Sequence, residues 1–183
     1  MHEGWRMTAK SKPKQEDTDL AAARRALRLE ADGISKLAEA LDPTFKQALD
    51  LIAGITGRTV VTGMGKSGHV ARKIAATLAS VGTPALYVHP AEASHGDLGM
   101  ITESDAIIAL SNSGETPELS DLLAYAKRHA IPVIAITSKY GSTLAEAADA
   151  ALILPPSPEA CPLGLAPMTS TTVMLALGDA VAV

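Results

Sequence analysis

The chain has 183 residues, of which 47% are hydrophobic and only 3% aromatic, and its formal net charge is −4. This length suits one domain with a substantial core, and the acidic charge and scarcity of aromatic rings argue against a nucleic-acid surface. The single cysteine, Cys161, cannot form an internal disulfide, and no secretory signal pattern opens the sequence. No stretch approaches the roughly 18 unbroken apolar residues of a membrane span. We therefore expect a cytoplasmic protein.

The first segment, residues 1–17, is polar and charged and has no periodic apolar face, which predicts a disordered tail. The folded domain is expected over 18–183. It opens with a predicted helix over 19–41, because apolar residues recur there every seven positions. These residues, here called the heptad seam, are Leu20, Leu27, Ile34 and Leu41.

A second helix is predicted after Asp42-Pro43, which stops the first helix and starts the next one, ending near Gly54 or Gly57. This helix pair can cover one face of the sheet, or the heptad seam of the first helix can meet another subunit. The small aromatic content of the core favours contact with another subunit.

From residue 59 onward, short apolar runs alternate with helical patterns, which predicts parallel strands joined by helices. The predicted strands span 59–61, 85–88, 106–110, 132–136 and 150–154. The predicted helices span 67–81, 117–129 and 143–148, with a loop or short helix through 99 and a last helix from 169 to the end. The fold class is therefore α/β, a three-layer α/β/α sandwich with a five-stranded parallel sheet, preceded by a helix pair.

In such doubly wound folds, ligands bind at the carboxyl ends of the strands. The segments expected to meet there are 63–68, 89–95, 111–116, 137–141 and 155–162. The third of them carries the hydroxyl groups of Ser111, Ser113 and Thr116, and a helical pattern follows it. Because helix N-termini attract anions, this loop fits a phosphate monoester. The alternative is that Ser113 or Thr116 simply caps the helix.

The segment 63–68 has the spacing Gly63-x-Gly65-x-x-Gly68 of dinucleotide-binding loops, but the next strand ends at His89 without an acidic residue for the ribose. A P-loop is also disfavoured, because Val60 stands where its first glycine belongs. We expect no cofactor. Lys66 opposes the dipole of the helix that it opens, at a cost of about 0.3–1 kcal/mol, which favours a bound anion over a solvated lysine.

Several other residues suggest chemistry less specifically. His89, His95 and Asp97 lack the spacing of a metal site, so we expect no metal and a role for His95 in contacting sugar hydroxyls or moving protons. A packed thiol is favoured over a nucleophile for Cys161. Partly buried carboxylates can act as general bases, and the candidates are Glu115, Glu118 and Glu159. A solvated surface carboxylate is the alternative for each.

Four segments together resemble the sugar isomerase (SIS) domain of bacterial arabinose 5-phosphate isomerases. The segments are Gly63-Met64-Gly65-Lys66-Ser67-Gly68-His69, His89-Pro90-Ala91-Glu92-Ala93-Ser94-His95-Gly96-Asp97-Leu98-Gly99, Ser111-Asn112-Ser113-Gly114-Glu115 and Glu159-Ala160-Cys161-Pro162-Leu163-Gly164-Leu165-Ala166-Pro167. The likeness runs from about residue 20 to residue 183. It implies a flavodoxin-like SIS fold and interconversion of D-ribulose 5-phosphate and D-arabinose 5-phosphate through a cis-enediol, without a cofactor.

The resemblance also implies a role in making Kdo, a sugar acid of lipopolysaccharide, and a homotetramer with active sites between subunits. By position, Lys66, Glu118, Glu159 and His95 form the implied catalytic set. The implied substrate-binding residues are Ser67, Ser111, Asn112, Ser113, Glu115 and Thr116. Either Glu118 or Glu159 is the base, and we favour Glu159 with Glu118 shuttling or orienting. Lys66 is expected to steady the enediolate oxygen.

The chain departs from the family pattern in two ways. A histidine of a Ser-His-Pro-Gly-Gly segment, and the pair of CBS domains that usually follows, both lie beyond its last residue, so we expect a truncated SIS core. Two alternatives to this isomerase stay open: a non-catalytic SIS module that binds a phosphosugar for regulation, and a paralogous isomerase from a sugar-alcohol operon.

Overall fold

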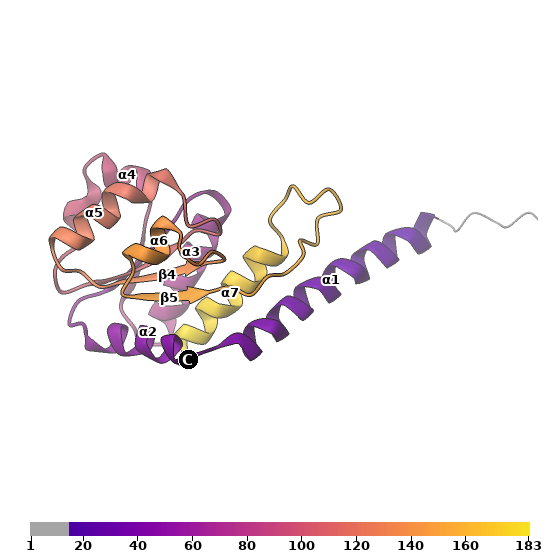
Figure 1. The fold of residues 1–183 in the computed structure, drawn as a ribbon, viewed down its shortest axis with the longest axis horizontal. Coiled ribbons are helices and arrows are strands. Elements are labelled where there is room, and N and C mark those ends of the chain that lie inside the picture. The colour runs from indigo at the N-terminus through magenta and orange to yellow at the C-terminus, as the bar shows by residue number, and fades with distance from the viewer. Residues whose placement is uncertain (1–14) are drawn as a thin grey trace, which may run out of the picture.

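The computed structural model describes residues 15–183 (Figure 1). The first helix, α1, spans Gln15–Ala40 and therefore begins before the predicted residue 19. Residues 1–14 of the predicted disordered tail lie outside the described residues. Residues 15–17 belong to α1, so the predicted boundary of the tail at residue 17 is wrong. The sequence places acidic residues at this start, and these are favoured in a first helical turn because they offset the positive end of the dipole.

Helix α1 extends away from the rest of the fold and packs along the last helix, α7, which spans Thr169–Ala182 (Figure 1). Gly33 makes this contact close, since a Cβ atom there would lie 2.8 Å from Cγ2 of Val173. The heptad seam is exposed, with 40 to 68% of each side chain accessible. The second helix of the pair, α2 (Pro43–Gly54), packs against the sheet, so the alternative that the helix pair covers a sheet face is confirmed for that helix. The heptad seam takes no part in this packing, and its contact with another subunit stays a prediction.

Helix α2 spans Pro43–Gly54 and begins as predicted. The side chain of Asp42 caps it by accepting a hydrogen bond of 2.8 Å from the Thr44 N–H. Pro43 fits the first turn, where a helix has no use for the missing N–H group.

The sheet has five parallel strands in the order β2-β1-β3-β4-β5, which confirms the flavodoxin-like expectation. Their bounds are β1 Thr59–Gly63, β2 Ala85–Val88, β3 Ala106–Leu110, β4 Val133–Thr137 and β5 Ala150–Ile153. Every residue of β1, β3 and β4 is buried, as expected for strands covered on both faces. The direction of winding reverses between β1 and β3.

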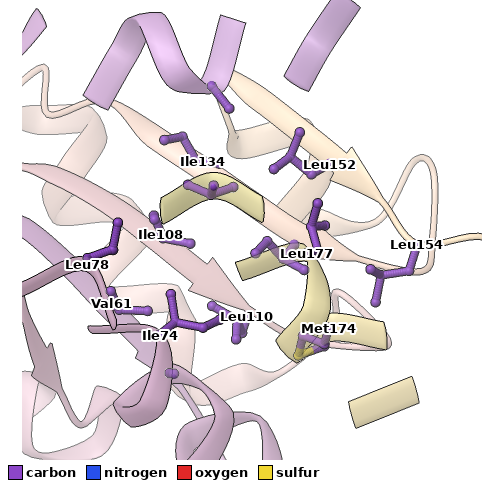
Figure 2. Packing of buried hydrophobic residues seen from close by; sticks show 14 of the residues in the cluster. Val61, Ile74, Leu78, Ile108, Leu110, Ile134, Leu152, Leu154, Met174 and Leu177 are labelled. Atoms are coloured by element: carbon purple, nitrogen blue, oxygen red, sulfur yellow. The ribbon is translucent and has the colours of Figure 1, made fainter. Parts of the chain in front are cut away.

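Two hydrophobic clusters lie on opposite faces of the sheet, because neighbouring strand residues point to opposite sides. On one face, Ile108 and Ile134 pack with residues of α2, α3 (Gly65–Ser80) and α7 (Figure 2). On the other, Ile107 and Val133 pack with residues of α5 (Ser120–Arg128) and α6 (Thr143–Ala147). The three-layer sandwich is confirmed.

Helices α3 and α7 approach each other closely in the first of these layers. A Cβ atom added at Gly178 of α7 would overlap the side chain of Ile74 of α3. Figure 2 shows Ile74 and Met174 converging on the β3 residue Leu110. The absence of a side chain at Gly178 thus sets the distance between the two helices.

Three helical segments differ from the expectation. The helix predicted over 117–129 is divided into a 3-10 turn, η2 (Pro117–Leu119), and α5. The turn is tighter because the Leu119 N–H donates to the Thr116 carbonyl, three residues back, at 3.1 Å. Helix α3 starts two residues before the predicted 67. The segment through residue 99 contains helix α4 (Pro90–Ser94) and a 3-10 turn, η1 (Asp97–Met100).

Candidate functional site

The carboxyl ends of the strands place the predicted site segments in a fixed order. Gly63 pairs with Leu110 in the register of β1 and β3, so the segment 64–68 begins beside the hydroxyl-rich loop 111–116. Because β4 lies on the other side of β3, the segment 137–141 flanks that loop from the opposite side. The loop thus lies at the β1/β3 switch point, where folds of this strand order bind ligands.

Loop 111–116 is organised by its own hydroxyl groups. The Ser111 and Thr116 hydroxyls share a hydrogen bond of 2.7 Å, and Ser111 Oγ also accepts from the Gly114 N–H at 3.0 Å. Ser113 Oγ accepts from the Glu115 N–H at 3.2 Å. No side-chain hydrogen bond from Ser113 or Thr116 caps η2 or α5. The capping hypothesis is therefore wrong, because these hydroxyl groups bond within the loop.

Hydrogen bonds also connect this loop to the N-terminus of α6. Both carboxylate oxygens of Glu115 accept hydrogen bonds from Thr143, from its N–H at 2.8 Å and from its hydroxyl at 2.6 Å. The hydroxyl bond and the N–H bond lower the pKa of Glu115. The Gly114 carbonyl accepts from the Leu144 N–H at 3.0 Å. Glu115 therefore holds the loop in place, and its predicted contact with substrate stays a prediction.

Gly114 lies at the point where the loop meets α6. Its φ of +71° belongs to the left-handed region, and a Cβ atom there would overlap the side chain of Ser142. Both the backbone conformation and the close approach thus require glycine at this position.

The glycine pattern of segment 63–68 has a packing explanation. A Cβ atom on Gly68 would lie 2.6 Å from the Gly63 carbonyl oxygen, so this glycine lets α3 approach β1 closely. The same carbonyl accepts a hydrogen bond of 3.1 Å from the Tyr87 hydroxyl. Lys66 is exposed in the first turn of α3, and Ser67, the next residue, is half-buried.

Glu159 lies in the loop between β5 and α7, where it borders a cavity of about 330 Å³. Its carboxylate accepts hydrogen bonds from the Met168 N–H at 2.7 Å and the Ser170 N–H at 3.3 Å. Burial raises the pKa of Glu159, but hydrogen bonds from Ser170 and Met168 outweigh it, and the pKa lies below the ordinary 4.5. Glu159 is therefore held as an ionised carboxylate.

The cavity brings together only part of the predicted set. Asn112 and Glu159 line it, together with Ser138, Lys139 and Ser170, which no sequence motif singles out. Their only sequence signal is their position, just after β4 and in the first turn of α7. A second cavity of about 240 Å³, between the loop and α6, is lined by Glu115 and Thr116.

Lys66, Glu118 and His95 do not line the cavity that borders Glu159. Glu118 is half-buried in η2, and His95 is exposed directly after α4. The structure of a single chain thus places the predicted catalytic residues along one edge of the sheet without gathering them in this cavity.

The remaining candidates do not assemble into a further centre. Within residues 15–183, no group of three or more His, Cys, Asp or Glu side chains is arranged to hold a metal ion. His89 precedes α4, and its Nδ1 atom is buried without a hydrogen-bond partner. Backbone N–H groups of Ala166, Leu163 and Leu165 lower the pKa of the Cys161 thiol, which does not line the cavity beside Glu159.

The strand order, the buried parallel sheet and the loop at its switch point define a doubly wound α/β ligand-binding domain. A family model described as the SIS domain matches residues 55–183. The chain belongs to the SIS domain family. Among residues 15–183, no helix is both long and apolar enough to cross a bilayer.

Known relatives support a narrower comparison. The chain is 53% identical over 162 residues to the arabinose 5-phosphate isomerase KdsD of Pseudomonas aeruginosa, covering 88% of this chain and 50% of that protein. It is 51% identical to KdsD of Yersinia pestis, covering 88% of this chain and 49% of that protein. The chain thus spans about half the length of these curated relatives.

The fold also matches a solved structure with a bound ligand. The protein c3406 of E. coli CFT073, solved in complex with arabinose 5-phosphate, superposes with a TM-score of 0.87 at 38% identity. The match covers 92% of this chain and 89% of that one. The whole doubly wound unit is therefore shared with a protein that binds this sugar phosphate.

Proposed function

We propose that this chain is the isomerase domain of an arabinose 5-phosphate isomerase, which interconverts D-ribulose 5-phosphate and D-arabinose 5-phosphate through a cis-enediol. The observation that carries the proposal is that Asn112, from the hydroxyl-rich loop, and the ionised Glu159 border the same cavity. The cavity thus joins the loop proposed to bind the phosphate to the carboxylate proposed as the base. Identity of 53% to a KdsD protein and the match to a structure with bound arabinose 5-phosphate support this substrate.

The reaction needs an anchor for the phosphate and a base beside the carbonyl. Ser111, Ser113 and Thr116 offer hydroxyl groups to the phosphate, with Ser67 helping from α3. The carboxylate of Glu159 removes the proton next to the carbonyl and returns it to the neighbouring carbon. Lys66 stabilises the negative oxygen of the enediolate, which forms between these two steps.

Glu118 and His95 complete the proposed catalytic set. Glu118, in the turn directly after the phosphate loop, shuttles a proton or orients the substrate. His95 contacts sugar hydroxyls or moves protons during ring opening. Because neither residue lines the cavity of a single chain, this assignment fits an active site that is completed between subunits.

The proposed assembly is a homotetramer. Its support is the exposed heptad seam on α1, together with the exposed Leu163 and Leu165 of the loop that follows Glu159. Exposed apolar side chains gathered along one helix are typical of surfaces that bind another protein. A cytoplasmic location and a role in Kdo synthesis for lipopolysaccharide belong to the same proposal.

The test measures proton exchange. Ribulose 5-phosphate is incubated with the chain in deuterated water, and loss of the C1 and C2 proton signals is followed by NMR, beside Glu159→Gln and Glu118→Gln variants. We expect exchange in the wild type and at least a roughly hundredfold slower exchange in the Glu159→Gln variant. Saturable sugar-phosphate binding without exchange would instead favour the regulatory binding module, and neither binding nor exchange would contradict both.

A further inference from the structure

The cavity that borders Glu159 is lined by a cation to which the proposed mechanism gives no role. Lys139 follows β4, and it lines the cavity together with Asn112 and Glu159. Within residues 15–183, no carboxylate lies within ion-pair distance of Lys139, whereas Lys46 pairs with Asp50 and Lys73 with Asp179. Lys139 therefore brings to the candidate site a positive charge that forms no ion pair.

The backbone of Lys139 is fixed from both sides. Its N–H donates to the Thr137 hydroxyl at 3.3 Å, and its carbonyl accepts from the Ser142 hydroxyl at 2.9 Å. A lysine whose backbone is held in this way has only its own flexible stem left to order when it binds a ligand. The entropic cost of engaging an anion is correspondingly limited.

The residue before Lys139 joins this segment to the phosphate loop. Ser138 donates to the Asn112 carbonyl twice, from its N–H at 3.1 Å and from its hydroxyl at 2.7 Å. Lys139 is thus the neighbour of a residue that is hydrogen-bonded directly to the loop. Any anion on that loop lies beside the position from which the Lys139 stem extends.

Charge balance at the loop gives Lys139 a function. Ser111, Ser113 and Thr116 are neutral donors, whereas a phosphate monoester carries about −1.5 to −2 charges at neutral pH. Lys66 is placed on the β1 side of the loop and Lys139 on the β4 side. Because Lys66 is assigned to the enediolate oxygen, Lys139 is left to pair with the phosphate dianion.

We propose that Lys139 is a substrate-binding residue that pairs with the phosphate group of the sugar phosphate. This inference rests on the proposed function of the same cavity. It assigns the selection of phosphorylated over free sugars to Lys139 together with the hydroxyl groups of the loop. The contribution of Lys139 is to ground-state and transition-state binding alike, since the phosphate keeps its charge throughout the reaction.

The experiment compares Lys139→Met, Lys139→Arg and a control, Lys127→Met, in the full chain. Lys127 is exposed in the last turn of α5, which leads to the opposite edge of the sheet. Calorimetry gives the Kd for D-arabinose 5-phosphate at low and high salt. A lost charge-assisted contact predicts about tenfold to a hundredfold weaker binding in Lys139→Met, within about threefold of wild type in Lys139→Arg, and no change in the control.

Salt adds a second readout that a merely structural lysine would not change. The Kd of the wild type should rise more steeply with salt than that of Lys139→Met, because screening acts on the charge that the variant lacks. Equal Kd values for wild type and Lys139→Met would overturn this inference and leave the proposed function standing. A wild-type chain that shows no saturable binding would overturn the proposed function as well.

Discussion

Glu115 and Thr143 are joined by two hydrogen bonds, which connect loop 111–116 after β3 to the first turn of α6. A loop with a glycine at its centre would otherwise lose more conformational entropy on binding an anion. Both carboxylate oxygens of Glu115 thus take part in holding the loop in its conformation.

Removing this brace should weaken substrate binding. The Glu115→Gln variant keeps one acceptor oxygen where the carboxylate has two, so it cannot accept both bonds from Thr143. The less ordered loop should raise the Kd for sugar phosphate about tenfold. Calorimetry measures this change. The matched control is Glu146→Gln, an exposed glutamate of the same helix as Thr143. Equal affinity in both variants would show that the brace has no part in binding.

The pH dependence of the reaction should report on Glu159. Because the hydrogen bonds at the start of α7 hold the pKa of Glu159 below 4.5, this carboxylate stays ionised, and able to accept a proton, to lower pH than an ordinary glutamate. The acid limb of kcat/KM should therefore fall below pH 4.5. A limb at about pH 6 would match the second pKa of the substrate phosphate, and a limb at any other pH well above 4.5 would mean that a different group is the base.

Asp105 should make stability depend on pH. This carboxylate is 1% exposed and accepts from the Arg58 N–H at 2.6 Å and the Thr102 N–H at 2.8 Å. Burial raises its pKa, but bonds from Thr102 and Arg58 outweigh burial, and the pKa lies below 3.8. Its contribution is complete above the unfolded pKa and is lost as the pH falls through the folded pKa.

The Asp105→Asn variant tests this contribution. At pH 7, urea unfolding should show a loss of about 1–3 kcal/mol, because the amide cannot accept every bond that the carboxylate accepts. The difference from wild type should shrink as the pH is lowered below 3.8. A deficit of the same size at every pH would rule out an ionised Asp105 as its cause.

The contact between α3 and α7 should be sensitive to one methyl group. Gly178→Ala places a Cβ atom against Ile74, so we expect a loss of about 1–3 kcal/mol in the free energy of unfolding, measured by urea titration. Gly54→Ala is the matched control in a helix, because no atom lies within 4 Å of its Cβ position. If the two variants are equally stable, the helices separate without cost.

The heptad seam should control assembly. Leu27→Asp places a charge on a side chain that is 68% exposed in the single chain, so it should leave the fold intact and reduce the oligomer to smaller species. Light scattering after size-exclusion chromatography measures the mass. Ala22→Asp, exposed on a different side of α1, is the control. An unchanged mass for Leu27→Asp would place the subunit contact elsewhere.

The sequence by itself determined the five strands and the order of the helices between them. Buried parallel strands such as 106–110 are continuous apolar runs, and the helices repeat their apolar residues about every 3.6 positions. Both patterns can be recognised within a short stretch of sequence. The hydroxyl cluster 111–116 was visible for the same reason, since one short segment contains all its donors. The resemblance to the SIS family rested on four such segments.

The tertiary structure alone decided how these segments act on one another. Thr143 is 28 residues from Glu115, and Ser170 is 11 residues from Glu159, so no local pattern predicts that each pair is bonded. It also decided that Thr116 bonds to Ser111 instead of capping a helix, because the tight turn η2 replaces the expected helix start. Lys139 joined the candidate site for the same reason: a strand order that places β4 beside β3 is a property of packing, and packing joins residues that are distant in sequence.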